Sequence, residues 1–140
     1  MHRAALSIVT LIAAAILAGP GHADAAPASH LYWGETSPGE IERIDLDPLA
    51  NRGTFLSESA EGLAVDELGG KIYWADNAAP DAIRRANLDG TGVEDIYPLT
   101  NSASGVAVDP INGKVYWAEN QGDAIRRADL DGSNVETFLT

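Results

Sequence analysis

Few side chains in this 140-residue chain could carry catalysis. It has no cysteine and three histidines, and two of these, His2 and His22, lie in a segment that we expect to be removed on export. His30 is then the one histidine left, and no G-x-S-x-G turn accompanies it. These counts argue against Ser-His-Asp or Cys-His catalysis. The acidic residues are scattered rather than gathered, so we predict no catalytic residue and no enzyme activity.

Two acidic turns superficially resemble the start of a calcium loop. They are Asn87-Leu88-Asp89-Gly90 and Asp129-Leu130-Asp131-Gly132. A calcium loop needs a third acidic position and a glutamate at its twelfth position, and both are missing. Asp-Gly is also a strong hairpin signal in its own right. We therefore predict hairpin turns here, with no metal and no cofactor.

Two arginine pairs recur at the same place in two similar segments, Arg84-Arg85 and Arg126-Arg127. Each pair puts one guanidinium on either face of a strand, where it could bind an anionic ligand or a neighbouring carboxylate. The candidate carboxylates are Asp66, Asp109 and the acidic residues that follow the tryptophans. Because the chain is strongly acidic, internal Arg–carboxylate pairs are the favoured reading. Arg85, Arg127, Glu35, Asp76 and Glu119 are then structural.

The elements that position these residues follow an aromatic repeat. Lys71-Ile72-Tyr73-Trp74-Ala75-Asp76 returns as Lys114-Val115-Tyr116-Trp117-Ala118-Glu119, and a shorter form is Leu31-Tyr32-Trp33-Gly34-Glu35. All three tryptophans stand in these copies, 41 and 43 residues apart. The residue types favour strands, and successive strand side chains point to opposite faces. We expect each Tyr-Trp pair to serve two packing interfaces, one ring per face, as structural residues of the repeat.

The chain divides into units of up to four short antiparallel strands. Residues 31–61 form an incomplete unit, and 62–104 and 105–140 form complete ones. Units of this kind every 40–45 residues indicate β-propeller blades. The predicted fold is all-β, with about three four-stranded antiparallel blades. The expected strands are 31–35, 40–45, 53–56, 62–66, 71–76, 82–88, 93–99, 105–109, 114–119, 124–130 and 135–139.

The recurring pattern Gly-Leu-Ala-Val-Asp, Lys-Ile-Tyr-Trp-Ala-Asp, Ile-Arg-Arg-Ala-Asn-Leu-Asp-Gly resembles the YWTD repeat, the class B repeat of low-density-lipoprotein receptors. The resemblance covers residues 31–140. It implies a six-bladed β-propeller that serves as a protein-binding or structural module. The threonine of the motif is replaced by Gly34, Ala75 and Ala118, and Asp76 alone keeps its aspartate.

Three units amount to half of such a six-bladed ring, and a half ring has two bare blade faces. Two copies related by a two-fold axis would complete it as a homodimer. A partial sequence of a longer propeller protein would have the same appearance. Both readings stay open at this point.

The first 25 residues have the pattern of a secretory signal peptide. A basic start, an apolar run from Leu6 to Leu17 and Ala23-Asp24-Ala25 follow in order, and the run is too short to span a membrane. Residues 26–30 read as a flexible lead-in. We therefore expect a secreted, extracellular or periplasmic protein without a stable membrane span. Its formal charge of −12 argues against nucleic acid as a partner and is compatible with basic protein surfaces.

Binding is expected at one rim, where the loops between strands 2 and 3 and between units gather. Loops on a rigid scaffold are where recognition usually occurs. The partner would be an unknown protein or extracellular ligand. The alternatives are a hydrolase or lactonase assembled from two chains around a channel metal, and a fragment without independent function. The candidate contact residues are Glu61, Asn77, Asn120 and Gln121.

Overall fold

The computed structural model describes residues 30–46 and 48–140, which form eleven strands and their turns. The expected signal peptide and residues 26–29 of the lead-in lie outside the described residues. The strands are β1 (His30–Glu35), β2 (Glu40–Leu46), β3 (Leu49–Leu56), β4 (Gly62–Asp66), β5 (Lys71–Asp76), β6 (Ala82–Asn87), β7 (Glu94–Pro98), β8 (Ala103–Asp109), β9 (Lys114–Glu119), β10 (Ala124–Asp129) and β11 (Glu136–Leu139). Within the described ranges no helix is long and apolar enough to cross a membrane.

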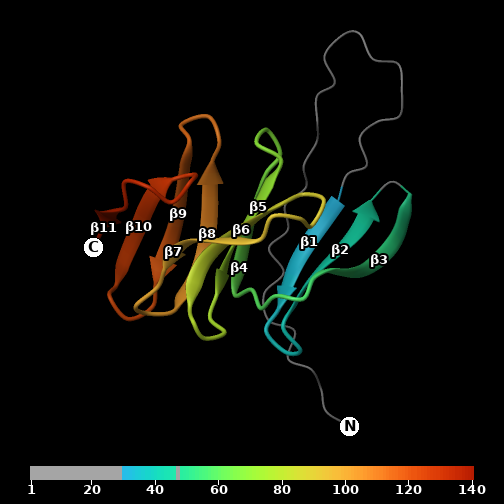
Figure 1. The fold of residues 1–140 in the computed structure, drawn as a ribbon, viewed down its shortest axis with the longest axis horizontal. Coiled ribbons are helices and arrows are strands. Elements are labelled where there is room, and N and C mark those ends of the chain that lie inside the picture. The colour runs from blue at the N-terminus through green and yellow to red at the C-terminus, as the bar shows by residue number, and fades with distance from the viewer. Residues whose placement is uncertain (1–29, 47) are drawn as a thin grey trace.

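Consecutive strands pair into three antiparallel sheets, which stand side by side in Figure 1. We call them blade 1 (β1–β3), blade 2 (β4–β7) and blade 3 (β8–β11). Blades 2 and 3 have four strands each and blade 1 has three. The all-β propeller fold expected from the repeats is confirmed. Among the described residues, blade 1 begins with the strand that carries Tyr32 and Trp33.

The strand bounds differ from the expected ones most at the start of β3. β3 begins at Leu49 rather than at residue 53, because the chain pairs with β2 directly after the turn, with Leu46 opposite Leu49. Asn51 has a φ of 53°, and the register shifts between Arg43 and Asp45. An irregular strand of this kind does not show the clean alternation from which strands are read.

The Asp-Gly hairpins are wider than a two-residue turn. β6 ends at Asn87 and β7 begins at Glu94, and the loop is closed by a 2.8 Å hydrogen bond from the Asn87 N–H to the Thr91 carbonyl. Gly90 has a φ of 85° and Gly132 a φ of 86°, conformations that favour glycine. The glycines thus play the expected turn role, but within longer loops.

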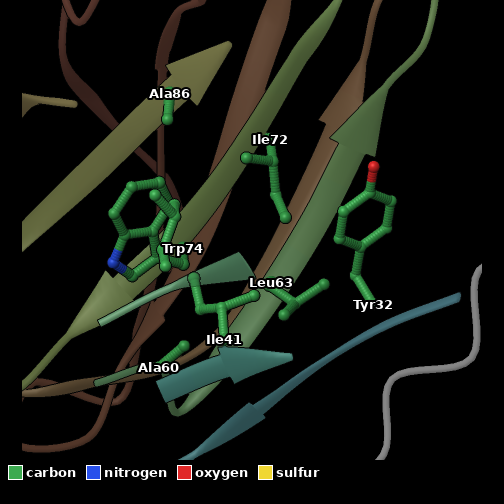
Figure 2. Close-up of a cluster of buried hydrophobic side chains, with 8 residues drawn as sticks. Tyr32, Ile41, Ala60, Leu63, Ile72, Trp74 and Ala86 are labelled. Carbon is green, nitrogen blue, oxygen red and sulfur yellow. The ribbon is translucent and has the colours of Figure 1, made fainter. Parts of the chain in front are cut away.

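The core consists of two apolar clusters, one between each pair of adjacent blades. Trp74 is fully buried in the cluster between blades 1 and 2, with Tyr32 and Ile41 from blade 1 (Figure 2). Its neighbour Tyr73 points the other way and is buried with Trp117 and Val115 of blade 3. The expected division of one ring per sheet face is confirmed for blade 2, because adjacent strand residues alternate between faces.

Candidate functional site

The β1–β2, β3–β4 and β5–β6 loops meet at one rim and enclose a pocket of about 540 Å³ between blades 1 and 2. Its walls come from loops that the sequence placed together on this rim. The antiparallel pairing sets this arrangement, because strand direction alternates and every second loop therefore lies at the same end of the sheets. The lining residues are Thr36, Pro38, Gly39, Ser57, Glu58, Ser59, Glu61, Asp76, Asn77, Ala78, Ala79, Pro80 and Arg84.

A charged cluster at this pocket is centred on Arg84. Its Nη1 lies 2.6 Å from Glu58 and 2.8 Å from Asp76, and its Nε lies 2.7 Å from Asp95. Glu58 belongs to the loop that follows blade 1, so this ion pair links two blades. Burial by itself would lower the pKa of Arg84, but the nearby carboxylates of Asp76, Asp95 and Glu58 outweigh it and raise that pKa.

The pocket keeps an excess of negative charge. Glu58, Glu61 and Asp76 line it, and Arg84 is the one cationic side chain among its lining residues. Asp76 also accepts a 2.7 Å hydrogen bond from the Ala78 N–H, which holds the β5–β6 loop. The carboxylates therefore outnumber the cation at the pocket, and its field favours a positively charged group.

Asn77 has a defined structural contact at this rim. Its Nδ2 donates to the Ala103 carbonyl at 2.9 Å, and its Oδ1 accepts from the Ala103 N–H at 3.1 Å. Both ends of the amide are thus used to tie blade 2 to the start of β8. Of the four predicted contact residues, Glu61 and Asn77 line the pocket, whereas Asn120 and Gln121 are exposed on the β9–β10 loop and do not.

The arginine pairs bind carboxylates, as favoured by the charge balance. Arg85 pairs with Glu94 and Arg127 with Glu136, each across to the outer strand of its own blade. Arg126 lies 3.4 Å from Glu119. The acidic residue that follows the tryptophan motif thus pairs with an arginine in both blades, Asp76 with Arg84 in blade 2 and Glu119 with Arg126 in blade 3.

The suggestion that Asp66 and Asp109 also pair with these arginines is wrong. Asp66 accepts from the Gly69 N–H at 2.8 Å, and Asp109 accepts from the Asn112 N–H at 3.1 Å. Both residues end a strand, and a carboxylate there reaches the backbone of the turn that follows. The sequence did hold a signal for this turn-closing role, because a tight turn follows the aspartate at the same position in both blades.

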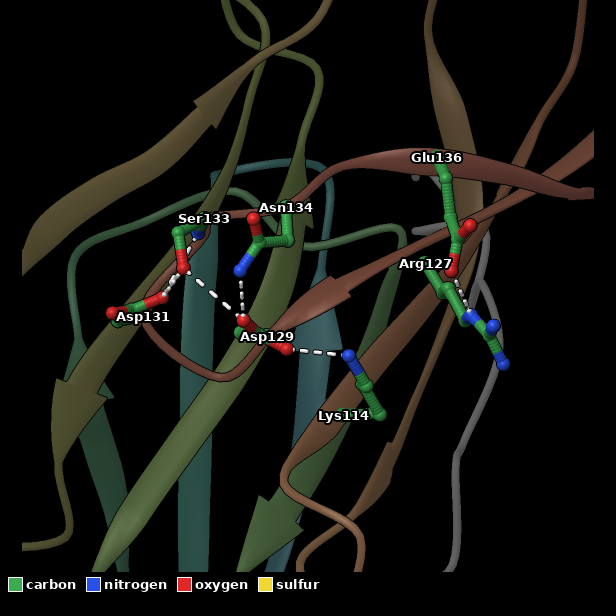
Figure 3. Close-up of polar contacts among 7 residues, drawn as sticks. All are labelled: Lys114, Arg127, Asp129, Asp131, Ser133, Asn134 and Glu136. Atoms are coloured by element: carbon green, nitrogen blue, oxygen red, sulfur yellow. Dashed lines mark hydrogen bonds and ion pairs between the residues drawn. The ribbon is translucent and has the colours of Figure 1, made fainter.

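The calcium-like turn of blade 3 is closed by its own hydrogen bonds (Figure 3). Lys114 Nζ lies 2.5 Å from Asp129, which also accepts from Asn134 at 2.6 Å. Ser133 donates to Asp131, also at 2.6 Å. Hydrogen bonds from Lys114 and Asn134 lower the pKa of Asp129. Among residues 30–46 and 48–140, no group of three or more acidic or histidine side chains is arranged to hold a metal ion.

The one described histidine lies away from the pocket. His30 begins β1, at the opposite end of that strand from the Thr36–Gly39 loop, and its Nε2 is 3.2 Å from Asp45. The pocket itself therefore presents carboxylates and an arginine, without a histidine.

Comparisons with known proteins agree with the propeller fold. The chain superposes with a TM-score of 0.70 and 30% identity on a chain of the crystal structure of a nidogen/laminin complex, covering 77% of this chain and 43% of that one. It superposes with a TM-score of 0.64 and 21% identity on a protein assigned as TolB from Agrobacterium tumefaciens, covering 77% and 44%. The three blades and these neighbours define the chain as a β-propeller protein.

Part of the chain is similar in sequence to two curated proteins, both of them nidogens. The chain is 36% identical to mouse nidogen-2 over 64 residues, 44% of its length. It is 38% identical to the nidogen of Drosophila melanogaster over 61 residues, 42% of its length. Each match covers 4% of the relative, and the chain spans less than half of either solved chain. A scan against models of known protein families finds no match.

Proposed function

We propose that this chain is an exported, non-enzymatic β-propeller module of the YWTD type that binds a protein partner. The observation that carries the proposal is the polar pocket of about 540 Å³ at the rim, built by loops from two blades on a rigid strand scaffold. The likeness to a chain of a nidogen/laminin complex supports protein binding, and the apolar N-terminal segment supports export.

The partner surface should be basic. The carboxylates of Glu58, Glu61 and Asp76 outnumber Arg84 at the pocket, and the whole chain has a formal charge of −12. A lysine or arginine side chain entering the pocket would meet these carboxylates, while an acidic segment would be repelled. Such binding should weaken as salt rises, because exposed charges are screened over about 10 Å at 0.1 M ionic strength.

A library of displayed linear peptides tests the proposal. The immobilised protein should enrich peptides rich in lysine or arginine, and a labelled copy should bind in solution by fluorescence polarisation. Ala78→Arg places a bulky cation at an exposed pocket position and should abolish that binding. Leu68→Arg is the matched control, since it adds the same charge at an exposed turn on the opposite rim.

Binding that survives Ala78→Arg, or that falls equally with Leu68→Arg, would place recognition elsewhere. Failure to enrich any peptide class would argue against peptide recognition at this rim. Circular dichroism of both variants establishes that the fold is kept, so loss of binding can be assigned to the pocket.

A further inference from the structure

We propose that two copies of this chain associate head to tail, with blade 1 of each copy packed on blade 3 of the other, and so close a ring. The occupant of both bare blade faces is then a second copy of the same chain. This inference does not depend on the rim function proposed above. It rests on an interface that the chain already makes twice within itself.

The outward face of blade 3 is a chemical copy of a face that is buried in blade 2. Tyr73, Ala75 and Ile83 are no more than 1% exposed where blade 3 covers them. Their counterparts in the repeat are Tyr116, Ala118 and Ile125, which are all partly exposed. These three line a shallow apolar groove of about 260 Å³. The same residue types are therefore buried in one blade and uncovered in the next.

The complementary face stands at the other end of the molecule, on blade 1. In the internal interfaces, the face that packs on the preceding blade carries Trp74 in blade 2 and Trp117 in blade 3, both buried. The matching position of blade 1 is Trp33, flanked across the strands by Leu31 and Ile44, and all three are partly exposed. Both halves of one interface are thus present, unpaired, among the residues that the structure describes.

A polar contact supports the same docking direction. Arg85 Nη1 crosses from blade 2 to donate a 2.7 Å hydrogen bond to the Leu130 carbonyl of blade 3. Arg127 is the counterpart of Arg85 on the open face, and Leu46 of blade 1 is the counterpart of Leu130. In the associated pair, Arg127 of one copy would therefore donate to the Leu46 carbonyl of the other.

The size of the solved relatives is consistent with closure by two copies. The aligned part of this chain covers 43% and 44% of the two solved chains, so two copies approach the length of one. Each copy contributes its blade 1 face and its blade 3 face once, which is a closed two-fold arrangement. If the same contacts did not close into a ring, the chain would form assemblies larger than a dimer. The mass measured in solution therefore distinguishes a closed dimer from an open assembly.

The new interface would differ from the internal ones at two points. Gly90 and Gly132 lie close to the outer strand of the preceding blade, and blade 1 has Pro48 at the matching position. The described part of blade 1 has three strands and no counterpart of β4, so these strands would leave Gly105 and Ala107 uncovered toward the centre. The docked area is therefore smaller than between blades 2 and 3, and the association should depend on concentration.

Sedimentation velocity on protein expressed from the full chain tests the association. The expected result is a species of twice the chain mass that dissociates on dilution. Ile125→Glu should give monomers, and Ile111→Glu should leave the dimer intact because Ile111 is 87% exposed on the β8–β9 turn. Arg127→Ala should raise the dimer dissociation constant about a hundredfold or more, because the variant dimer loses one hydrogen bond to a charged group at each of its two docked interfaces.

Cross-linking determines the direction of docking. The chain has no native cysteine, so Tyr116→Cys and Leu31→Cys each add a single thiol to one face. A short thiol cross-linker should join the two variants when mixed and leave either variant alone unjoined. Monomers at all concentrations, assemblies larger than dimers, dimers that resist Ile125→Glu while keeping a native circular dichroism spectrum, or cross-links within one variant would each overturn the proposal.

Discussion

Blades 2 and 3 have almost the same sequence and very different surroundings. Gly62 and Ala64 in β4 are buried, whereas Gly105 and Ala107 in β8 are exposed, although each pair holds the same place in its repeat. The cause is position, because among the described residues blade 2 packs against a blade on each face and blade 3 against blade 2 only. Equal residues in the two blades should therefore contribute unequally to stability, and repeat identity does not predict energetic importance.

The rim clusters of the two blades differ for a second reason. Arg84 in blade 2 meets three carboxylates, but Arg126 in blade 3 is near Glu119 only among the described residues. Counted back from Gly62 and Gly105, the position that matches Glu58 is Asn101, and the position that matches Asp95 is Thr137. Here the sequence itself changes between repeats. The pocket between blades 1 and 2 consequently has a charged wall that blade 3 cannot reproduce.

The largest expected difference concerns the tryptophans. Trp74→Ala should lower the free energy of unfolding by about 3–5 kcal/mol, because a fully buried ring is lost between two blades. Trp33→Ala should cost much less, since Trp33 is partly exposed and lies under the exposed Arg52 guanidinium at 5.2 Å. Urea unfolding at low protein concentration measures both. Equal losses would show that the outer face of blade 1 is as well covered as its inner face.

The isoleucine of the third strand gives the next comparison. Ile83→Ala should cost about 2–5 kcal/mol, because Ile83 is fully buried between blades 2 and 3. Ile125→Ala should cost less than half as much in dilute solution, where its face is partly exposed. The same urea experiment, repeated over a range of concentrations, checks this. If Ile125→Ala becomes costlier as concentration rises, the open face of blade 3 is covered by association.

Two turn glycines test how closely the blades approach each other. Gly90→Ala and Gly132→Ala should both cost about 1–2 kcal/mol for the left-handed backbone. At Gly132 the new methyl group would also overlap the Ile96 carbonyl, whereas at Gly90 the nearest atom is 3.7 Å away. Gly132→Ala should therefore cost about 1–3 kcal/mol more, as overpacking does. Matching thermal shifts for the two variants would contradict the closer contact at Gly132.

The smallest effect is expected from acid. Hydrogen bonds from Lys114 and Asn134 lower the pKa of Asp129, so its carboxylate stabilises the folded protein above its unfolded pKa of about 4. That contribution is lost as pH falls through the lowered folded pKa. The melting temperature should thus fall less steeply below pH 4 for Asp129→Asn than for the parent protein. Asp123→Asn, on the other rim, is the control that should keep the parent slope, and parallel curves for all three would refute the assignment.

Much of the blade architecture could be predicted from the sequence repeats. The strand pattern around Tyr73 and Trp74 predicted the blade and the division of its rings between two faces. The loops on the shared rim were predicted together because antiparallel strands return to the same end. The cross-blade pair of Arg84 with Glu58 was missed, since nothing local links two residues that belong to different blades. The turn role of Asp66 and Asp109 was missed because a carboxylate next to a strand also suits an ion pair.

That this protein is built from β-propeller blades could be predicted from its sequence, because the alternation of strand side chains and the spacing of the aromatic pairs are local properties of the chain. Which copy of each repeated residue is buried, and where the charged pocket lies, depend on how the blades pack against one another. Burial depends on what lies on the other side of a sheet, and repeats of similar sequence in a row have different neighbours. The physical difference between Tyr73 and Tyr116 is the presence of the next blade.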